Sequence, residues 1–592
     1  MPKASNSDIA RILSEIGEYL AMKNVPWKPR AYDKASQTIA SLEEEVISVY
    51  EKGGLKAVEE IPGVGRSIAE KIEEFIKTGK IKYYEELKKK TPVKLDELTR
   101  IEGLGPKSVK KLYEKLGVSN LKELEKAARE GKIKNLEGFG PKSEENILKG
   151  MAFVKKSGGR FLLGDMMPAI KSLEAVLGRS PGVERLTVAG SVRRWKETIG
   201  DLDLLVVAGN FKPVMDAFTS LPGVVRVLAK GDTKSAVKLA SGLQVDLRVV
   251  PAKSYGAALN YFTGSKSHNV RLRQIAINKG LKLNEYGLFS AKGRSALGGK
   301  GSKEKMIAGE TEEEIYRALG MDYIEPEMRE DTGEIELALR QAQGKQPGLP
   351  KLVGYGDLMG DLQTQTDWTD GSATILDMAK AASKVGLKYI AITDHTKRLA
   401  MTHGLDEARL LKQMAEIDRV NKELMGKIKV LKGTECDILK DGSLDIKDEV
   451  LAKLDVVGVS VHSYFNLDRK AQTERIIKAM ENPNADILFH PTGRLIQKRE
   501  AYDVDMDAVI AAAKKTKTIL EIDAYPDRLD LKDEYIKKSV EAGVKMAIDS
   551  DAHAAQHFSV LEYGIAQARR GWAEREDIIN AWPMEKMFEM LK

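Results

Sequence analysis

Three aspartates next to apolar stretches are the residues of this sequence best suited to phosphoryl chemistry. Asp201 and Asp203 are two residues apart and lead into the apolar run Leu204–Val207, so a strand would place both carboxylates on one face. Asp246 stands in a second apolar stretch, Gln244–Val250. Adjacent carboxylates repel unless a cation lies between them, and their hard oxygens select Mg²⁺ or Mn²⁺. Three such acids can hold two ions about 3.5–4 Å apart, which stabilises the attacking and leaving oxygens of phosphoryl transfer.

The residues ahead of these acids could bind a phosphate. Gly190 and Ser191 offer backbone amides and a hydroxyl, while Arg193 and Arg194 offer positive charge. The alternative is an aspartate pair in a loop that only caps turns. The apolar strand that follows the pair disfavours this alternative.

A glycine pattern recurs three times in the first 150 residues. The copies are Ile61-Pro-Gly-Val-Gly65, Ile101-Glu-Gly-Leu-Gly105 and Leu136-Glu-Gly-Phe-Gly140. Two glycines around an apolar residue allow a tight hairpin, and the free amides that begin the next helix can hold a phosphate. This is the helix-hairpin-helix pattern, which binds nucleic-acid backbones without reading sequence; the alternative is a set of turns that serve only packing. The candidate DNA contacts are Gly63, Gly65, Gly103, Gly105, Lys107, Gly138, Gly140 and Lys142.

Beyond residue 356, several apolar runs end in a side chain that could bind a metal. The side chains at or near the ends of these runs are His395, Glu435, His462, His490 and His553. Because such strand ends meet at one rim of an α/β barrel, we expect a shared site there. Mixed nitrogen and oxygen donors suit Mn²⁺, Zn²⁺ or Fe²⁺. A lone histidine is usually structural, and we interpret His403 and His557, which end no such run, as surface residues.

The elements that position these residues follow from the spacing of apolar side chains. Residues 1–150 show helical spacing, with helices expected over Asp8–Leu20, Tyr32–Ser41 and Ser67–Ile76. From about residue 160 the pattern predicts mixed strands and helices; the strands are 185–188, 202–207, 224–228, 236–239 and 244–250, and the helices 169–177 and 214–219. Residues 330–356 are polar and rich in glycine and proline, which predicts a linker. Beyond them, alternating strands and helices predict a parallel α/β arrangement.

Composition limits the class of protein. The 592 residues suggest about three to five domains. No run of 18 apolar residues predicts a membrane span, and no signal peptide is evident at the start. Cys436 is the only cysteine, so we expect no disulfide framework and a reducing compartment. The predicted localisation is cytoplasmic, in association with the nucleoid. Residues 1–300 carry 53 basic and 35 acidic residues, whereas residues 301–592 carry 42 and 53, which favours a polyanion-binding first half.

Three segments together resemble the family X DNA polymerases, the DNA polymerase beta group. They are Gly190-Ser191 with Gly200-Asp201-Leu-Asp203, then Tyr261-Phe-Thr-Gly264 through Asn269 to Arg273, and Ile61 to Ile72. The resemblance implies that Asp201, Asp203 and Asp246 bind the catalytic Mg²⁺ or Mn²⁺ ions, and that Asp246 helps to deprotonate the primer 3′-hydroxyl. The implied nucleotide contacts are Gly190, Ser191, Arg194, Gly200, Tyr261, Phe262, Gly264 and Asn269, and Arg273 would contact the template strand.

The same resemblance implies a lyase site near the N-terminus. Lys71 matches the amine that attacks the C1′ aldehyde of an abasic sugar, and Lys28 and Tyr32 match positions of the lyase pocket. Ser67 stands where the family usually has a lysine that holds the 5′-phosphate. The alternative is that Lys71 is one more basic residue on a DNA-binding helix.

The last part of the chain resembles a PHP (polymerase and histidinol phosphatase) domain, which commonly uses three metals for 3′–5′ exonuclease or other phosphoesterase work. The implied ligands are Asp370, His395, Glu435, His462, His490, Asp551 and His553. The family usually reads Asp-Leu-His-x-His where this chain has Asp361-Leu-Gln363-Thr-Gln365. Glutamine replaces imidazole poorly as a ligand, so the alternative to an active exonuclease is a barrel that contributes mainly structure.

The predicted fold is multidomain, α and α/β: a helix-hairpin-helix N-terminal region, a mixed α/β nucleotidyltransferase palm with a thumb and fingers subdomain, and a distorted (β/α) barrel of PHP type. The expected domains are 1–85 (lyase-like), 86–158 (helix-hairpin-helix), 159–252 (palm), 253–329 (nucleotide- and template-binding), 330–356 (linker) and 357–592 (PHP). The predicted function is DNA-directed DNA synthesis in short gaps during base excision repair, by a monomer that uses deoxynucleoside triphosphates on gapped or primer–template DNA. The alternatives are a non-catalytic DNA-end-binding scaffold and a template-independent or RNA nucleotidyltransferase.

Overall fold

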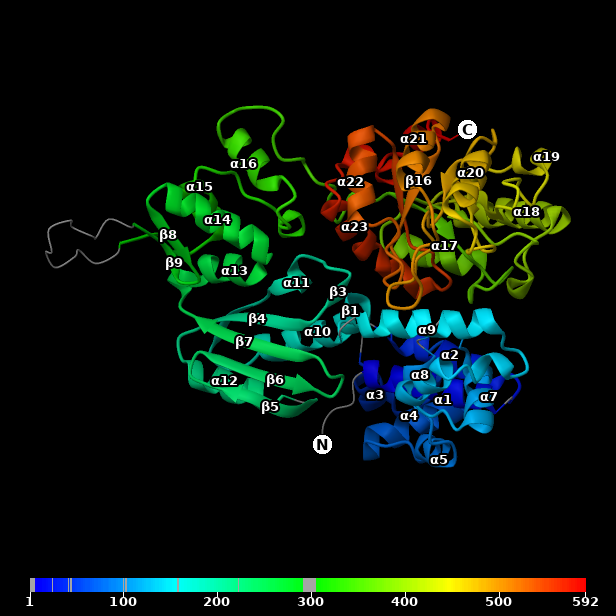
Figure 1. Cartoon of the computed structure of the whole chain (residues 1–592), viewed down its shortest axis with the longest axis horizontal. Helices are drawn as coiled ribbons and strands as arrows, with labels where there is room; N and C mark the ends of the chain where they lie inside the picture. The colour runs from blue at the N-terminus through cyan, green and yellow to red at the C-terminus, as the bar shows by residue number, and fades with distance from the viewer. Residues whose placement is uncertain are drawn as a thin grey trace, which may run out of the picture. The chain divides into compact units, whose positions relative to one another are not determined.

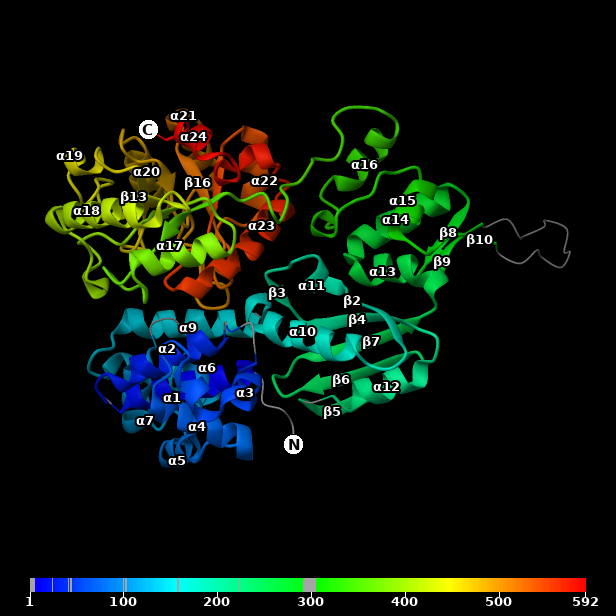
Figure 2. The same cartoon turned by 180° about the vertical axis from the view of Figure 1, so that it is seen from behind.

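The computed structural model describes residues 6–23, 25–40, 42, 45–99, 101, 104–156, 159–221, 223–290 and 305–591 (Figures 1 and 2). The chain divides into two compact units. The first contains residues 1–160, 165–172 and 495–500, and the second contains residues 161–164, 173–494 and 501–592.

The described residues up to 156 form helices joined by short turns, as predicted. The helices are α1 (Asn6–Met22), α2 (Lys28–Ala40), α3 (Val46–Glu59), α4 (Arg66–Thr78), α5 (Lys82–Lys90), α6 (Leu95–Leu98), α7 (Pro106–Leu116), α8 (Leu121–Arg129), the 3₁₀ turn η1 (Ile133–Asn135) and α9 (Pro141–Lys156). Among the described residues, buried apolar side chains form one cluster from Ile9 to Leu87 and a second that spans mainly Val93 to Met151. Helices α4 and α7 both end at a left-handed glycine, Gly79 and Gly117, which stops each helix without a steric penalty.

A five-stranded sheet in the order β2-β4-β7-β6-β5 follows. Its strands are β2 (Val183–Val188), β4 (Asp201–Ala208), β5 (Val224–Lys230), β6 (Lys234–Leu239) and β7 (Gln244–Val250), accompanied by α10 (Leu163–Gly178), α11 (Gly190–Arg193) and α12 (Phe211–Thr219), and by the short pair β1 (Phe161–Leu162) and β3 (Thr198–Ile199). All five predicted strands are confirmed. Strand β4 pairs antiparallel with β2 and parallel with β7, and its Leu202 and Leu204–Ala208 side chains are buried.

Helices and a small antiparallel sheet follow the five-stranded sheet. They are η2 (Ala252–Ser254), α13 (Tyr255–Thr263), α14 (Lys266–Asn278), β8 (Leu281–Asn284), β9 (Gly287–Ser290), β10 (Met306–Ala308), α15 (Glu312–Ala318), η3 (Pro326–Met328) and α16 (Glu334–Ala342). The prediction that residues 330–356 are only a linker is wrong at α16. Ile335 and Ala338 of this helix are fully buried in the same cluster as Leu272 and Tyr316, because its amphipathic face outweighs the polar composition around it.

Residues from 357 onward form a nearly closed barrel of seven parallel strands in the described chain, in sequential order. The strands are β11 (Gly360–Thr364), β12 (Tyr389–Ile392), β13 (Lys429–Asp437), β14 (Val456–Ser460), β15 (Ile487–Leu488), β16 (Ile519–Asp523) and β17 (Met546–Asp549). A parallel bridge between Thr364 and Ala552 joins the first strand to the segment after the last. The larger helices of this region are α17 (Ile375–Lys384), α18 (Glu407–Leu424), α20 (Arg469–Met480), α21 (Met506–Thr516), α22 (Asp533–Ala542) and α23 (Leu561–Arg570) (Figure 1). The shorter ones are η4 (Ala400–Thr402), α19 (Asp448–Leu451), η5 (Ala555–Val560), η6 (Arg575–Asp577), η7 (Ile579–Ala581) and α24 (Met584–Phe588).

The predicted fold class, mixed helical and α/β with a parallel barrel at the end, is confirmed. Each strand of the barrel is buried along almost its whole length, as expected for a parallel sheet with both faces covered. Within the described residues, no helix is long and apolar enough to span a membrane.

Candidate functional site

The three aspartates predicted to bind metal, Asp201, Asp203 and Asp246, lie together on two parallel strands. Asp203 of β4 is directly opposite Asp246 of β7, and Asp201 is opposite Gln244. Burial, and then the charges of Asp201 and Asp246, raise the pKa of the Asp203 carboxyl to about 7. The pKa is raised because burial and repulsion by the other two carboxylates destabilise the ionised form of Asp203. A divalent cation between the acids would stabilise that ionised form. The donors are hard oxygens, so the residues present fit Mg²⁺ or Mn²⁺.

Gly190 begins the short helix α11 against this carboxylate cluster. Its φ of +63° is a left-handed conformation that favours glycine. A Cβ atom at Gly190 would also overlap the carboxylate of Asp203. The backbone N–H of Ala189 donates to the carbonyl of Asp203 at 2.8 Å, which fixes the approach of the two segments. The Gly-Ser turn and the acids predicted from the sequence are therefore adjacent.

The two arginines after this turn have different surroundings. Arg193 forms an ion pair with Glu312 (Nη2 to Oε2, 2.6 Å) and donates to the Thr263 hydroxyl at 2.7 Å. Arg194 pairs with Glu330 (Nε to Oε1, 3.1 Å) and donates to the Thr263 carbonyl. Arg193 therefore links α11 to α13 and α15. From the sequence we had expected Arg193 to offer its charge to a phosphate, and this structural role was not predicted.

The predicted nucleotide-binding segment brings the ends of α13 and α14 together. Asn269 donates from Nδ2 to the carbonyl of Tyr261 at 2.7 Å, and Arg273 donates from Nε to the carbonyl of Asn269 at 3.2 Å. The rings of Tyr261 and Phe262 meet edge to face, with centroids 5.1 Å apart. Gly264 connects the helices with a φ of +69°.

The three Gly-X-Gly units share one backbone turn. In each unit the N–H of the apolar residue donates to the carbonyl three residues earlier: Val64 to Ile61 (2.9 Å), Leu104 to Ile101 (3.0 Å) and Phe139 to Leu136 (3.0 Å). The Val64 and Leu104 side chains are buried, and Phe139 packs against the second cluster. The described residues of all three copies thus make the hydrogen bond expected of this hairpin.

The hairpin glycines precede helices, as predicted. Gly65 caps α4, Gly105 caps α7, and Gly140 immediately precedes α9. Gly63 and Gly138 are left-handed, with φ of +80° and +86°; Lys107 and Lys142 are exposed in the first turns of α7 and α9. Gly103 lies outside the described residues.

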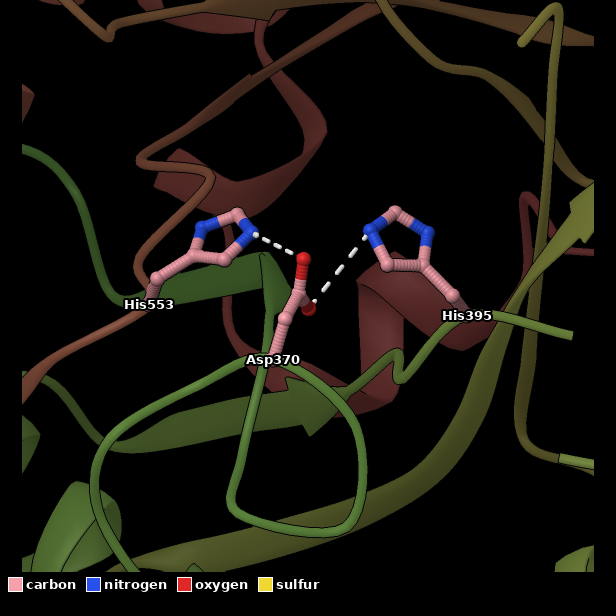
Figure 3. A group of neighbouring side chains, drawn as sticks. All are labelled: Asp370, His395 and His553. Atoms are coloured by element: carbon pink, nitrogen blue, oxygen red, sulfur yellow. Dashed lines mark ion pairs between the residues drawn. The ribbon is translucent and has the colours of Figure 1, made fainter. Parts of the chain in front are cut away.

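One group of possible metal donors in the barrel joins three loops (Figure 3). Asp370 lies 3.7 Å from His395 (Oδ1 to Nε2) and 3.8 Å from His553 (Oδ2 to Nε2). One ligand atom from each of the three lies within 4.8 Å of the others. Figure 3 shows both imidazole rings turned toward the Asp370 carboxylate.

A second group shares His395 with the first. The Glu435 carboxylate lies 3.2 Å from His395 Nδ1, 3.1 Å from His462 Nε2 and 2.8 Å from His490 Nε2. Burial by itself would raise the pKa of the Glu435 carboxyl. The charges of His395 and His462 outweigh this effect, so the pKa is well below its ordinary value. Asp551, the remaining predicted ligand, lies 3.7 Å from His553 (Oδ1 to Nδ1). The predicted ligands therefore converge, and their mixed nitrogen and oxygen donors fit a transition-metal site.

The two glutamines of the first barrel motif are also buried at this rim. Gln365 donates from Nε2 to Glu435 at 2.9 Å, and so directs an N–H toward the carboxylate where an imidazole would offer a lone pair. Neither amide atom of Gln363 has a hydrogen-bond partner in the described chain. The glutamine pair therefore does not fit a metal position as two histidines would.

Comparisons with known proteins agree with these geometries. The family model of the DNA polymerase beta thumb matches residues 258–330, and that of the PHP domain matches residues 361–583. Models of a helix-hairpin-helix domain and of a SAM-like helix-hairpin-helix tandem match residues 4–81 and 95–151. The chain is 36% identical over 593 residues to the DNA polymerase/3′-5′ exonuclease PolX of Bacillus subtilis (strain 168), with 99% of each chain covered.

This chain belongs to the family X DNA polymerases that carry a PHP domain. It is also 26% identical over 351 residues to rat DNA polymerase lambda, covering 55% of this chain and 56% of the relative. A probable phosphatase of Thermoanaerobacter sp. (strain X514) is 30% identical over 230 residues, covering 37% of this chain and 88% of the relative.

The predicted lyase lysine of this family X polymerase lies on α4. Lys71 donates from Nζ to the carbonyl and hydroxyl of Ser67 at 2.9 and 3.1 Å, and its amine lies 5.2 Å from the ring centroid of Tyr83. Burial lowers the pKa of the Lys71 amine, and the charge of Lys28 lowers it further. The charges of nearby glutamates raise it, but the net effect is a lowered pKa. Tyr32 is buried, and burial raises the pKa of its phenol to about 12.

Several residues of the barrel site were missed from the sequence. Glu521 accepts from the His490 backbone N–H at 2.5 Å, and Arg528 lies between Asp523 (3.4 Å) and Asp551 (3.6 Å). The run Ile519-Leu-Glu-Ile-Asp523 ends in carboxylates like the runs we selected, so the same signal could have found this strand.

Two further residues contact the predicted histidines. Asp437 lies 3.4 Å from His462 (Oδ1 to Nδ1). His557, which we interpreted as a surface residue, is only partly exposed, and its Nδ1 accepts the backbone N–H of His553 at 3.3 Å. His403 is exposed, as expected.

Proposed function

We propose that this family X polymerase fills short gaps in DNA during repair. The primer 3′-oxygen forms a bond to the α-phosphorus of a deoxynucleoside triphosphate, the bond to the bridging oxygen breaks, and pyrophosphate leaves. The observation that carries the proposal is the direct opposition of Asp203 and Asp246, with Asp201 on the same face, beside the turn at Gly190. Mg²⁺ or Mn²⁺ held by these acids would neutralise charge on the triphosphate. Asp246 would accept the proton of the 3′-hydroxyl.

The remaining roles follow from position. The amides of Gly190 and Gly200, the Ser191 hydroxyl and Arg194 would hold the triphosphate, and Tyr261 and Phe262 would lie beneath the sugar. The Asn269 amide would contact the edge of the incoming base, and Arg273 the template. These are positioning and charge-stabilising roles, which phosphoryl transfer depends on.

The test is Asp203→Asn, assayed on a one-nucleotide gap, blunt DNA and an RNA primer. Incorporation should fall by roughly 10²-fold or more while binding of gapped DNA is retained. The matched control is Asp216→Asn, which removes an exposed carboxylate of the same domain that pairs with Lys230. Synthesis near the normal rate by Asp203→Asn would contradict the metal assignment and favour a scaffold. Preference for blunt DNA or RNA over the gap would favour the alternative transferases.

We propose that the PHP domain of this chain is a metal-dependent phosphoesterase that removes 3′-terminal nucleotides. The supporting observation is that two donor groups, Asp370–His395–His553 and His395–Glu435–His462, share one imidazole. Mn²⁺, Zn²⁺ or Fe²⁺ in these groups would activate water and neutralise the phosphate. With Gln363 and Gln365 in place, we expect digestion that is slower than two histidines would allow.

Single-stranded DNA with Mn²⁺ tests this activity. Asp370→Asn and His553→Gln should each abolish digestion, and Asp203→Asn should leave digestion intact. The double substitution Gln363→His/Gln365→His should increase the rate. An unchanged rate in the double variant, with strong digestion by the unmodified chain, would show that the glutamines do not impair the site.

We further propose that Lys71 forms a Schiff base with the C1′ aldehyde of an abasic sugar and promotes β-elimination of the 5′-deoxyribose phosphate. The lowered pKa of this amine favours the neutral, nucleophilic form. Lys28 and Tyr32 would line the pocket. Borohydride should trap a covalent adduct with the unmodified chain and with Lys77→Ala, a control on the same helix, but not with Lys71→Ala. Undiminished trapping by Lys71→Ala would refute this role.

We propose that the chain acts as a monomer with the five expected domains, 1–85, 86–158, 159–252, 253–329 and 357–592, and that the joining segment 330–356 includes the helix α16. We also propose that it binds gapped DNA through Gly63, Gly65, Gly103, Gly105, Lys107, Gly138, Gly140 and Lys142. The nucleoid association expected from the sequence stays a prediction. Sedimentation with and without gapped DNA would test the monomeric state.

A further inference from the structure

An exposed tyrosine lies beside the second donor group of the barrel. Tyr464 follows His462 by two residues, in the loop after β14. The exposed fraction of this residue is 40%. Its φ of +57° is a conformation that a tyrosine adopts only when its surroundings impose it.

A buried arginine holds this loop in place. Arg475 is a buried residue, and its guanidinium donates to the carbonyl of Leu439 at 2.8 Å and to that of Ser463 at 2.9 Å. The same guanidinium lies 5.7 Å from the ring centroid of Tyr464. The ring is thus supported from the interior and presented at a fixed place, so its exposure is a property of the folded rim.

Two exposed cations accompany the ring. Arg398 donates from Nη2 to the Tyr464 hydroxyl at 3.2 Å, with its guanidinium carbon 5.8 Å from the ring centroid. The Lys440 ammonium lies 5.9 Å from the same centroid. Within the described chain, neither Arg398 nor Lys440 forms an ion pair with a carboxylate, so both charges are available to a ligand.

The position of this cluster relates it to the donor site. Arg398 follows His395 by three residues and Tyr464 follows His462 by two, and the rings of these histidines are 5.1 Å apart. An aromatic face with unpaired cations beside it is the combination that binds a single-stranded nucleic acid, since bases stack on the ring and phosphates meet the cations. A small phosphate ester would need the charges but not the ring.

We propose that Tyr464, Arg398 and Lys440 form a binding subsite for the 3′-terminal segment of single-stranded DNA. A base near the 3′ end stacks on Tyr464, and the two cations contact phosphates next to the bond that is cut. This inference rests on the proposed phosphoesterase function of the PHP domain and names its substrate class. A paired end fits the subsite poorly, because its bases are already stacked in the duplex.

Kinetics on two substrates test the subsite. Tyr464→Ala should raise KM for single-stranded DNA roughly tenfold with little change in kcat, whereas KM for p-nitrophenyl phosphate should change by less than about twofold. Tyr464→Phe, which keeps the ring, should restore KM for DNA. Equal effects of Tyr464→Ala on both substrates, or none on DNA, would overturn the proposal.

Salt dependence tests the cations. Arg398→Gln/Lys440→Gln should reduce the slope of log KM against log salt by about 1.4, at about 0.7 per phosphate of a single strand. The matched control is Lys427→Gln/Lys453→Gln, which removes two exposed charges elsewhere in the same domain. An equal change of slope in both double variants would show a general charge effect and contradict the subsite.

A readout without catalysis separates this proposal from the proposed activity. Full-length protein in EDTA is crosslinked by light to an oligonucleotide that carries 4-thiothymidine at its 3′ end, and the modified peptides are mapped by mass spectrometry. Crosslinks to the loops of Arg398 or Tyr464, weakened in Tyr464→Ala, support the subsite even if no digestion is seen. Digestion of DNA without such crosslinks supports the phosphoesterase but refutes the subsite.

Discussion

At the residue scale, Gly190 shows how closely the palm is packed around its acids. Its left-handed φ favours glycine, and the space that a Cβ atom would need is filled by the Asp203 carboxylate. Asp203 is itself confined by its strand, because its carbonyl accepts the Ala189 N–H and its neighbours Leu202 and Leu204 are buried. The Asp203 carboxylate would therefore have to move to admit a methyl group.

We predict that Gly190→Ala reduces nucleotide incorporation by roughly 10²-fold, since a shift of about 1 Å in a catalytic group has an effect of that size. Steady-state incorporation on a one-nucleotide gap measures it, and binding of gapped DNA should be unchanged. Gly178→Ala is the control, because a Cβ atom there meets no other atom. Normal incorporation by Gly190→Ala would show that the turn adapts without moving Asp203.

At the scale of elements, a buried histidine joins α14 to α16. His268 contacts Glu334 (Nδ1 to Oε1, 2.8 Å) and Tyr316 (Nε2 to Oη, 2.9 Å), and all three side chains are fully buried. Glu334 also accepts the backbone N–H groups of Asp331 and Thr332. This network explains why part of the predicted linker is an ordered helix: its first residue is anchored in the core of the preceding domain.

We predict that protection of α14 and α16 from hydrogen–deuterium exchange decreases as pH falls from about 7 to 5. Burial, with the charge of Arg329, lowers the pKa of His268 below its ordinary value despite Glu334 and Asp331. The unfolded segment therefore binds a proton first, so the stabilisation is complete above the ordinary histidine pKa and is lost below it. The pKa of Glu334 is also lowered, so the stabilisation that its ionised form provides is retained between pH 7 and 5 and is lost only at lower pH.

The comparison that isolates His268 is His268→Gln against His403→Gln. Exchange is measured at each pH and corrected for its intrinsic pH dependence. His268→Gln should remove most of the loss of protection between pH 7 and 5, while His403→Gln, at an exposed residue, should retain it. Identical pH profiles in the two variants would contradict a role for His268.

At the scale of the whole molecule, charge is divided between the two halves of the sequence. Residues 1–300 carry a net charge of +18 and residues 301–592 carry −11. The hairpins that would bind DNA backbones belong to the basic half, and the barrel acids belong to the other. Binding of gapped DNA should therefore depend on specific basic residues of the hairpins more than on the total charge of +7.

We predict that Lys107→Gln/Lys142→Gln reduces the slope of log binding constant against log salt by about 1.8, at about 0.9 per duplex phosphate. Lys384→Gln/Lys388→Gln removes the same charge from exposed positions in the acidic half and should leave the slope almost unchanged. Fluorescence anisotropy with gapped DNA measures both. Equal slopes in the two variants would show that only net charge matters.

Much of the local structure and many site residues could be predicted from the sequence, because they depend on near neighbours. Alternation along β4 places Asp201 and Asp203 on one face, and the Gly-X-Gly spacing requires the turn seen in all three hairpins. Apolar runs that end in histidine or carboxylate predicted the barrel rim, since parallel strands end together.

Only the tertiary structure decided which distant residues meet. The opposition of Asp203 to Asp246, the pairing of Arg193 with Glu312, and the sharing of His395 by two donor groups depend on strand register and loop packing. Helix α16 could not be predicted from its own sequence for the same reason, because residues of other helices cover its apolar face. Residue types and short spacings determined what chemistry this chain can hold, and long-range packing determined where those groups come into contact.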